Sequence, residues 1–210
     1  MKKFLIAVIV LAAIGVAVFY LMPSGKDETK GLTSAGAGAA KTVEVVQATS
    51  GDSTFVLGEG NTAIDFTCAK TVAGKTLNVQ GGWSGEFSSK LAGEALVGAD
   101  DALRSIKLEI ETGSVWSEHD MLTKALTSWG LFQVVEHPKA TFITTAIKPG
   151  APDSAGFSNA THTLEGNFKL NGIEKSISIP AAIEVAGDQL KIQSAFSLNR
   201  KEFNCGLVDV

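Results

Sequence analysis

The stretch "HTLEGNFKLNGIEKSISIPAAIEV", residues 162–185, decides the fold class. Apolar and polar residues alternate along it with a period of two, first over residues 162–170 and again over residues 177–185. Such alternation is typical of half-buried antiparallel strands, because successive side chains of a strand point to opposite faces of the sheet. The residues "LNGIEKS" between the two runs contain the Asn and Gly of a hairpin turn. We therefore expect two antiparallel strands joined by a hairpin.

The same alternation recurs through much of the chain from residue 53 onward. It is present in residues 64–69, in residues 106–111, in "ATFITTAI" (140–147) and in residues 190–198, while "VAGDQ" supplies a second hairpin turn. About eight strands of this length can close into an antiparallel barrel that has no free edge and has room for one ligand. We expect an all-β, eight-stranded antiparallel barrel, with a two-sheet sandwich as the alternative.

One segment, "HDMLTKALTSWG" (119–130), has the apolar spacing of a helix instead. Ser117 or Asp120 would cap its start, and Gly130 would end it. Pro138 then interrupts the chain before the next strand. We expect one short helix that lies across one mouth of the barrel, with apolar contacts from Trp116, Met121, Leu126, Trp129, Leu131 and Phe132.

The N-terminus contains an uninterrupted apolar run, residues 4–22, preceded by Lys2 and Lys3. Its length matches a hydrocarbon core of about 30 Å, and the two lysines would remain in the cytoplasm. We interpret residues 1–22 as a signal anchor or a cleaved signal peptide, residues 23–50 as a flexible linker and residues 51–210 as the barrel domain. The domain is then periplasmic or otherwise extracytoplasmic, and the retained anchor would hold it at the cytoplasmic membrane.

Composition excludes some function classes and restricts the ligand. The 210 residues carry a net charge of -4, so the chain lacks the basic surface that binding to nucleic acid requires. The inward-facing sets of the expected strands contain almost no charge, so an interior ligand should be apolar. A solid packed core explains the same pattern without any ligand.

The His119-Asp120 pair invites a catalytic interpretation, but the sequence gives it no partners. The chain has three histidines, and His119, His137 and His162 do not follow a metal-ligand spacing. We predict no catalytic residue, no metal site and no cofactor, and hence a protein that is not an enzyme.

Three separated segments resemble the YceI-like family. "LFQVVEHPKATF" (131–142) resembles the family pattern of two bulky residues, Asp-Val, a Pro and a small residue before Phe. "LEGNFKLNGIEKSISIP" (164–180) is similar to the family signature Gly-x-Leu-x-Leu-x-Gly-x-x-Lys-x-Val, and "FSLNRKEFNCG" (196–206) to its closing Arg-x-x-Phe-Gly strand. The resemblance covers about residues 53–207, and it implies an exported, lipocalin-like barrel that encloses a polyisoprenoid. At the aligned His-Leu pair of the family this chain has Ala125-Leu126, so His119 inherits no family role.

From this resemblance we predict that the protein is a carrier or sequestering protein for a long-chain isoprenoid or a similar amphiphilic lipid. His162 shares its predicted face with Leu164 and Phe168, either as a core histidine or as a contact for the ligand head group. The alternative is a membrane-tethered structural or interaction module with a filled barrel. The sequence leaves the oligomeric state open. The predicted ligand-lining residues are Ile64, Phe66, Trp83, Ile106, Leu108, Phe142, His162, Leu164, Phe168, Ile179 and Phe196.

We predict a disulfide between Cys68 and Cys205, the two cysteines of the chain. An exported protein is in an oxidising compartment, and the first long strand and the last strand become neighbours when a barrel closes. Closing so long a loop would stabilise the fold by about 4–5 kcal/mol in the chain-entropy model. Thiol titration of the denatured, unreduced protein checks this: we expect no free thiol in a monomer, and two per chain would refute the pairing.

Overall fold

The structure is a computed structural model that describes residues 34–44, 46–58, 60–69, 71–72, 75–76, 84–128, 131–150 and 157–205. The predicted membrane segment (1–22), Trp83 and Trp129 lie outside these ranges. Within them, no helix has the length and apolarity needed to cross a membrane.

Strands form most of the described chain, as the alternation predicts, and α1 (Asp120–Thr127) is the one α-helix within the described ranges. Short 3-10 helices follow β8 and β12, namely η1 (Thr112–Ser114) and η2 (Arg200–Phe203). The strands are β1 (Gly38–Ala39), β2 (Ser53–Leu57), β3 (Ile64–Ala69), β4 (Thr71–Val72), β5 (Lys75–Thr76), β6 (Ser84–Ser89), β7 (Leu91–Val97), β8 (Leu103–Glu111), β9 (Lys139–Pro149), β10 (His162–Leu170), β11 (Ile173–Ala186) and β12 (Gln189–Gln193).

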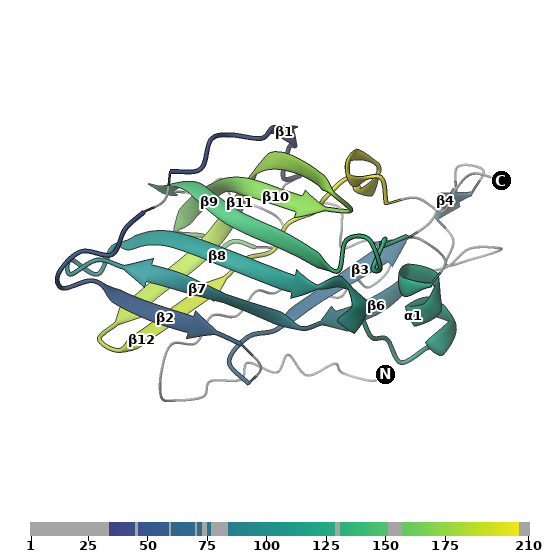
Figure 1. Cartoon of the computed structure of the whole chain (residues 1–210), viewed down its shortest axis with the longest axis horizontal. Helices are drawn as coiled ribbons and strands as arrows, with labels where there is room; N and C mark the ends of the chain where they lie inside the picture. The colour runs from purple at the N-terminus through teal and green to yellow at the C-terminus, as the bar shows by residue number, and fades with distance from the viewer. Residues whose placement is uncertain are drawn as a thin grey trace.

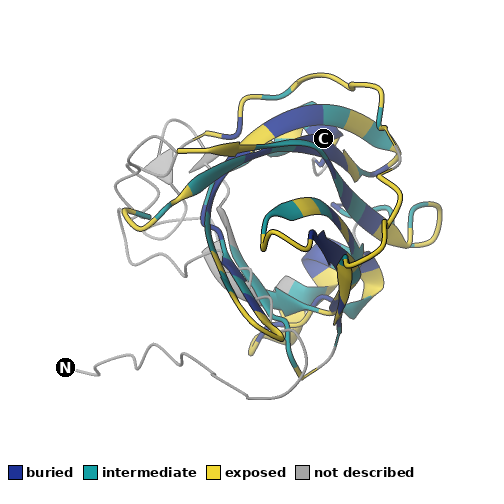
Figure 2. Cartoon of the chain, turned by 90° about the vertical axis from the view of Figure 1, so that its left-hand side faces the viewer, coloured by how far each residue is buried: buried dark blue, intermediate teal, exposed yellow. Residues whose placement is uncertain are grey.

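The main sheet is antiparallel and has the order β1-β11-β10-β9-β8-β7-β2, with β12 also paired to β11. The two predicted hairpins are present, since β10 joins β11 through Asn171-Gly172 and β11 joins β12 through Gly187-Asp188. Long strands cross one another at an angle in Figure 1, and Figure 2 shows that the sheet is strongly curled.

The expected closed barrel is wrong for the described residues, because no ladder among them joins the two ends of the curled sheet. The β3–β6 pair forms a separate two-stranded sheet, although β2 and β7 precede and follow it directly. A turn at residues 58–62 causes the break: Asn61 Oδ1 accepts a hydrogen bond from Gly58 N, and Thr62 Oγ1 donates to Gly58 O. This turn occupies the backbone groups that would otherwise continue the ladder from β2 into β3.

The last strand is also shorter than the alternation over residues 190–198 predicts. The β12 ladder ends at Gln193, and the buried Ser194 side chain donates a 2.6 Å hydrogen bond to Pro180 O. Beyond it, Ser197 O accepts from Ala35 N. The chain therefore leaves the sheet edge and crosses to η2 instead of continuing as a strand.

A bulge in β9 sets the direction of its side chains. The register between β9 and β10 shifts at Thr145, since Gly166 pairs with Thr144 whereas Glu165 pairs with Ala146. The Thr144 hydroxyl replaces part of the ladder with β8: it lies 2.9 Å from Ile106 N, from which it accepts, and 3.3 Å from Ile106 O. The extra residue bends the strand, as bulges generally do.

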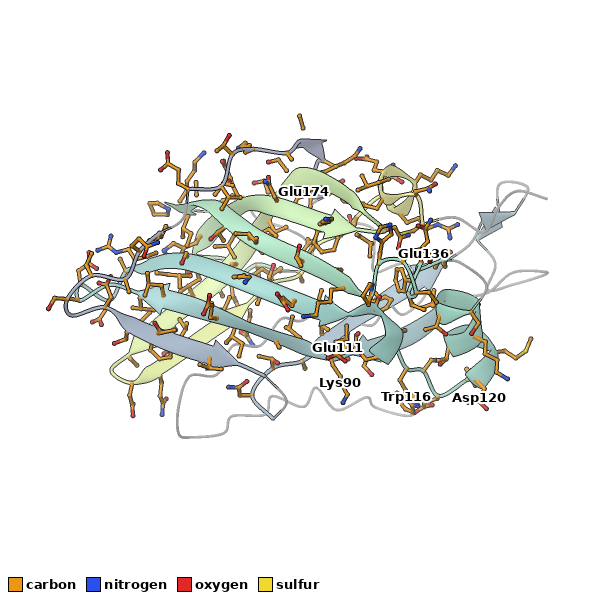
Figure 3. The ribbon with its side chains drawn as sticks, in the orientation of Figure 1. Lys90, Glu111, Trp116, Asp120, Glu136 and Glu174 are labelled. Atoms are coloured by element: carbon orange, nitrogen blue, oxygen red, sulfur yellow. The ribbon has the colours of Figure 1, made fainter. Side chains whose placement is uncertain are left out.

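Helix α1 lies at one end of the curled sheet (Figure 1), as expected, but several of its predicted contacts are absent. Leu126 and Leu131 are fully buried, whereas Trp116 is 59% and Met121 66% exposed. In Figure 3 the Trp116 and Asp120 side chains lie on the outer side of this end. Only one face of the helix packs inward, so Trp116 and Met121 do not seal the mouth.

The predicted capping of α1 is wrong as well. His119 occupies the N-cap position without a side-chain capping bond, and Asp120 is the first helical residue. Ser117 is two residues too early to cap the helix; its backbone N–H donates to Thr123 Oγ1 at 3.0 Å. The bend before the helix is thus held by a threonine inside it.

The Asn171 side chain connects the turn of the β10–β11 hairpin to the loop after α1 by hydrogen bonds. Its Nδ2 donates to Leu131 O at 2.9 Å and to Cys205 Sγ at 3.2 Å, and its Oδ1 accepts from Gln133 N at 3.0 Å. The residue is buried and has a positive φ of 48°, and Gly172 follows with a φ of 76°. One side chain therefore joins the hairpin, the loop and the segment after η2.

Asn171→Ala should destabilise the protein more than Asn171→Gly. Both remove the three hydrogen bonds, each of which contributes about 0.5–1.5 kcal/mol, but only alanine also strains the left-handed turn, at about 1–2 kcal/mol. Urea unfolding followed by circular dichroism measures both losses. Equal losses in the two variants would show that backbone strain contributes nothing here.

Residues 34–41 of the predicted linker are packed on the main sheet: β1 extends its edge, and Ala35 is buried in the core. β1 pairs with β11, and the buried Asn167 of β10 holds Lys41 from both sides, accepting from its N–H at 2.9 Å and donating to its C=O at 2.6 Å. The Lys41 ammonium also pairs with Glu165 at 2.9 Å, and Lys148 pairs with the same carboxylate.

Stability should depend on pH through Glu165, because the hydrogen bond from Lys148, followed by that from Lys41, lowers the pKa of its carboxyl below 4.5. A depressed folded-state pKa stabilises the fold above the unfolded-state pKa, and the contribution is lost as the pH falls through the folded-state value. Glu165→Gln should therefore be less stable than wild type at pH 7, and this deficit should shrink as the pH falls through the folded-state pKa of Glu165. Glu184→Gln, which removes an exposed carboxylate from β11, is the control; a Glu165→Gln deficit that stays constant through acid titration would contradict the linkage.

Candidate ligand-binding interior

The structure gathers most of the predicted lining residues into one apolar cluster on the inner face of the curled sheet. Six of them are buried in this interior cluster, and three more are partly buried against it. Their role as ligand contacts stays a prediction. The buried six are Ile106, Leu108, Phe142, Leu164, Phe168 and Ile179, and the partly buried three are Ile64, Phe66 and Phe196.

Strand register explains why these residues meet. Leu108 on β8, Phe142 on β9 and Phe168 on β10 are direct cross-strand neighbours, so their side chains form a row across the sheet. Gly166 leaves room for this row, because a Cβ there would lie 2.5 Å from the Phe142 ring. Leu164 extends the inner face toward β11, where it faces Ile179.

Two aromatic pairs connect the interior cluster to neighbouring segments. Phe168 meets Phe203 of η2 edge to face, with ring centroids 5.3 Å apart. Phe66 of β3 lies 6.1 Å from Phe132 in the loop after α1. The separate β3–β6 pair is thereby packed against the rest of the fold through side chains.

His162 differs from the other predicted lining residues. It is half-buried at the start of β10, and its Nδ1 is 2.8 Å from Thr161 Oγ1. This neighbouring hydroxyl satisfies one ring nitrogen without a ligand. Trp83 lies outside the described residues.

Two buried polar atoms have no hydrogen-bond partner among the described residues: Thr145 Oγ1 and Arg200 Nη1. The bulge explains the first. Before the bulge, Phe142 and Thr144 face the interior cluster, and after it Ile147 does. The extra residue of the bulge therefore places both Thr144 and Thr145 toward the interior cluster. Sequence alternation missed both atoms, because a bulge leaves no clear signal in the period and Arg200 follows the last strand.

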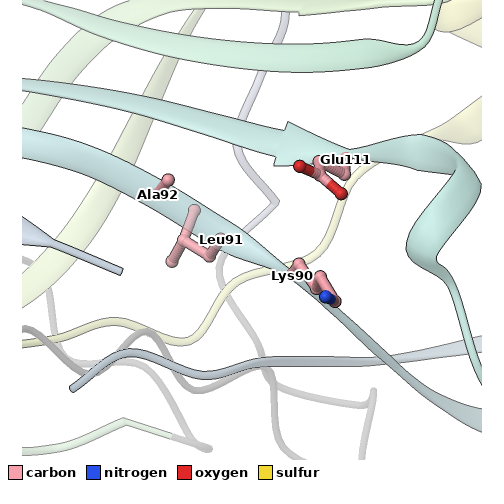
Figure 4. A pocket seen from close by; sticks show the side chains of 4 residues that line it. All are labelled: Lys90, Leu91, Ala92 and Glu111. Atoms are coloured by element: carbon pink, nitrogen blue, oxygen red, sulfur yellow. The ribbon is translucent and has the colours of Figure 1, made fainter. Parts of the chain in front are cut away.

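A surface pocket of about 240 Å³ lies where β7 begins and β8 ends, lined by Lys90, Leu91, Ala92 and Glu111 (Figure 4). This volume is below the roughly 300–1,000 Å³ of typical small-molecule sites. Three of its four lining residues are exposed. It is a poor fit for a long apolar chain, and we do not assign it a ligand.

The histidines and cysteines are the residues that could hold a metal ion or form a disulfide. His119 is exposed beside α1, and no group of three His, Cys, Asp or Glu side chains within the described ranges is placed to hold a metal ion. Cys205 is buried and follows η2, so the expectation that it lies on the last strand is wrong. Cys68 belongs to β3, whose described ladder is with β6. No disulfide is found among the described residues, but the Cys68 side chain lies outside them, so the pairing stays a prediction.

Comparison with known proteins agrees with this architecture. A UPF0312 protein of Pectobacterium carotovorum is 29% identical over 105 residues, which cover 47% of this chain and 50% of that protein. A UPF0312 protein of Pseudomonas aeruginosa is 35% identical over 83 residues, covering 40% of this chain and 39% of that protein. The chain therefore matches half or less of the length of these curated relatives.

Among solved structures, Burkholderia cenocepacia BcnA superimposes with a TM-score of 0.52 at 17% identity, over 68% of this chain and 80% of BcnA. This likeness supports the fold. The YceI-like domain pattern matches residues 42–210, which include α1, every strand of the main sheet except β1, and most of the interior cluster. The chain belongs to the YceI-like domain family.

Proposed function

We propose that this protein binds a long-chain isoprenoid or a similar amphiphilic lipid inside its curled sheet, as a carrier or sequestering protein and without catalysis. The observation that carries the proposal is the continuous apolar inner face, from Ile106 through Phe142 to Leu164, with the unpaired hydroxyl of Thr145 facing it. Membership in the YceI-like family supports the same ligand class.

Burial supplies the affinity in this proposal. Each CH₂ group removed from water contributes about 0.8 kcal/mol, so a few isoprene units give useful affinity without a charged contact. The β3–β6 pair has no described ladder to the main sheet and contacts it through Phe66 and Phe132. Side-chain contacts can open at lower cost than a continuous ladder, which would let a chain enter between the two sheets.

The site of action in this proposal is outside the cytoplasmic membrane. The apolar run at residues 4–22 follows two lysines, which favours export of everything after it. A binding domain tethered there could exchange a lipid with the bilayer, since a long isoprenoid is nearly insoluble in water.

A second candidate is an interaction module with a filled interior. The observation in its favour is the exposure of large apolar side chains, with Val56 63% and Val135 85% exposed in addition to Trp116 and Met121. Exposed apolar residues can mark a partner surface when they form a patch. In that case the interior cluster serves only stability.

Lipid extraction decides between the two candidates. The full chain, purified without added lipid, should yield about one long-chain lipid per protein in an organic extract examined by mass spectrometry. Leu164→Trp adds volume to the fully buried inner face and should lower the recovered lipid several-fold while the protein stays folded. Val56→Trp makes a similar change at an exposed position of β2 and should leave the yield unchanged.

A solid core predicts a different outcome. Wild type would then give no lipid, and Leu164→Trp would lose about 1–3 kcal/mol of stability through overpacking. That combination would refute the lipid-binding proposal and favour the interaction module.

A further inference from the structure

The 3-10 helix η2 directs Arg200 toward the interior. In a 3-10 helix there are three residues per turn, so side chains at positions i and i+3 share a face. Phe203 is i+3 from Arg200, is 1% exposed, and packs edge to face on Phe168 of the interior cluster. The Arg200 side chain therefore starts on the face of η2 that meets the interior.

The rest of η2 fixes this orientation. Lys201 is exposed, and Glu202 pairs with Lys175 of β11 at 3.4 Å, so an ion pair also holds η2 to the main sheet. Asn199 caps the start by accepting from Lys201 N at 3.2 Å. At the other end, Arg200 O accepts from Cys205 N at 3.0 Å. These contacts hold the backbone of η2 in place, and with it the position from which the Arg200 side chain starts.

The guanidinium has no protein partner for its buried nitrogen. Nη1 of Arg200 is inaccessible to solvent and makes no hydrogen bond within the described residues, and no ion pair of Arg200 is present there. Glu202, a carboxylate on the same short helix, is already engaged by Lys175 and by Asn199 Nδ2. An arginine keeps its charge at any physiological pH, and leaving a donor of this kind buried without an acceptor is costly.

We propose that Arg200 binds the oxyanion head group, phosphate or carboxylate, of the amphiphile whose chain occupies the interior. This inference rests on the proposed function and deepens it by naming the head-group chemistry. The planar guanidinium fork matches two oxygens of a phosphate or a carboxylate, and such bidentate pairs are among the strongest hydrogen bonds in proteins. The apolar chain then extends from η2 past Phe203 and Phe168 along the inner face.

Matched amphiphiles test the head group. With delipidated full-length protein, geranylgeranyl phosphate should bind at least tenfold more tightly than geranylgeraniol, which has the same chain and no charge. Arg200→Gln should remove this preference while the affinity for geranylgeraniol stays within twofold. Arg200→Lys, which keeps the charge but not the fork, should retain part of it. Lys201→Gln removes the adjacent exposed charge and is the control, expected within twofold of wild type for both ligands.

A second pair separates the two oxyanions. Hexadecanoate and hexadecanol differ in the same way, so a preference for the acid that Arg200→Gln removes assigns carboxylate recognition. A preference confined to the phosphate pair assigns phosphate recognition. Either result supports the inference.

Two outcomes overturn it. If wild type and Arg200→Gln bind geranylgeraniol and its phosphate equally, the head-group inference fails while lipid binding stands. If no amphiphile binds to any variant, the proposed function fails with it.

The stability of lipid-free Arg200→Met gives an independent readout. Because the buried nitrogen has no acceptor to lose, this variant should melt at the wild-type temperature or above it. A marked fall in the melting temperature, together with equal weakening of all four ligands, would assign Arg200 a structural role and refute the inference.

Discussion

The register of β9 against β10 is the constraint on which the interior depends. Phe142 stands beside Phe168 and over Gly166, and a slip of β9 by one residue would turn the Phe142 ring to the outer face, away from Phe168. Gly166 fixes this register because any larger residue would collide with the Phe142 ring. The bulge at Thr145 then lets Ile147 face inward as well, so that apolar side chains cover the inner face on both sides of the irregularity.

Much of the fold could be predicted because the inner face is apolar and period two is a strong signal. The strands around His162–Leu170 and Ile173–Ala186, their Asn-Gly turn and α1 follow directly from the sequence. Closure could not be predicted, since it depends on long-range pairing and on the turn at residues 58–62, where Asn61 and Thr62 capture backbone groups of Gly58. The prediction of the end of β12 was wrong for a similar reason: Ser194 continues the alternation, but its hydroxyl donates a hydrogen bond to Pro180 O.

The candidate site was predictable in its apolar part only. Alternation places Leu108, Phe142 and Phe168 on one face of the sheet, because a buried face requires an apolar residue at every second position. It assigns His162 to the same face, yet at the start of β10 that position is half-buried and has a Thr161 hydroxyl beside it. Thr145 and Arg200 carry the unmatched polar atoms: Thr145 lies in the alternating run 140–147 but the bulge changes its face, and Arg200 follows the last strand.

The geometry of η2 gives a physical reason for the spacing of the closing Arg-x-x-Phe motif. The three-residue spacing places Arg200 and Phe203 on one face, so the aromatic ring that anchors the helix to Phe168 also fixes the face from which the Arg200 side chain starts. An apolar residue in place of Arg200 would avoid a buried donor without an acceptor and would cost the fold little. Selection for stability alone therefore does not account for an arginine here, whereas a ligand with an oxyanion head group would supply the missing acceptor and recover the desolvation cost on binding.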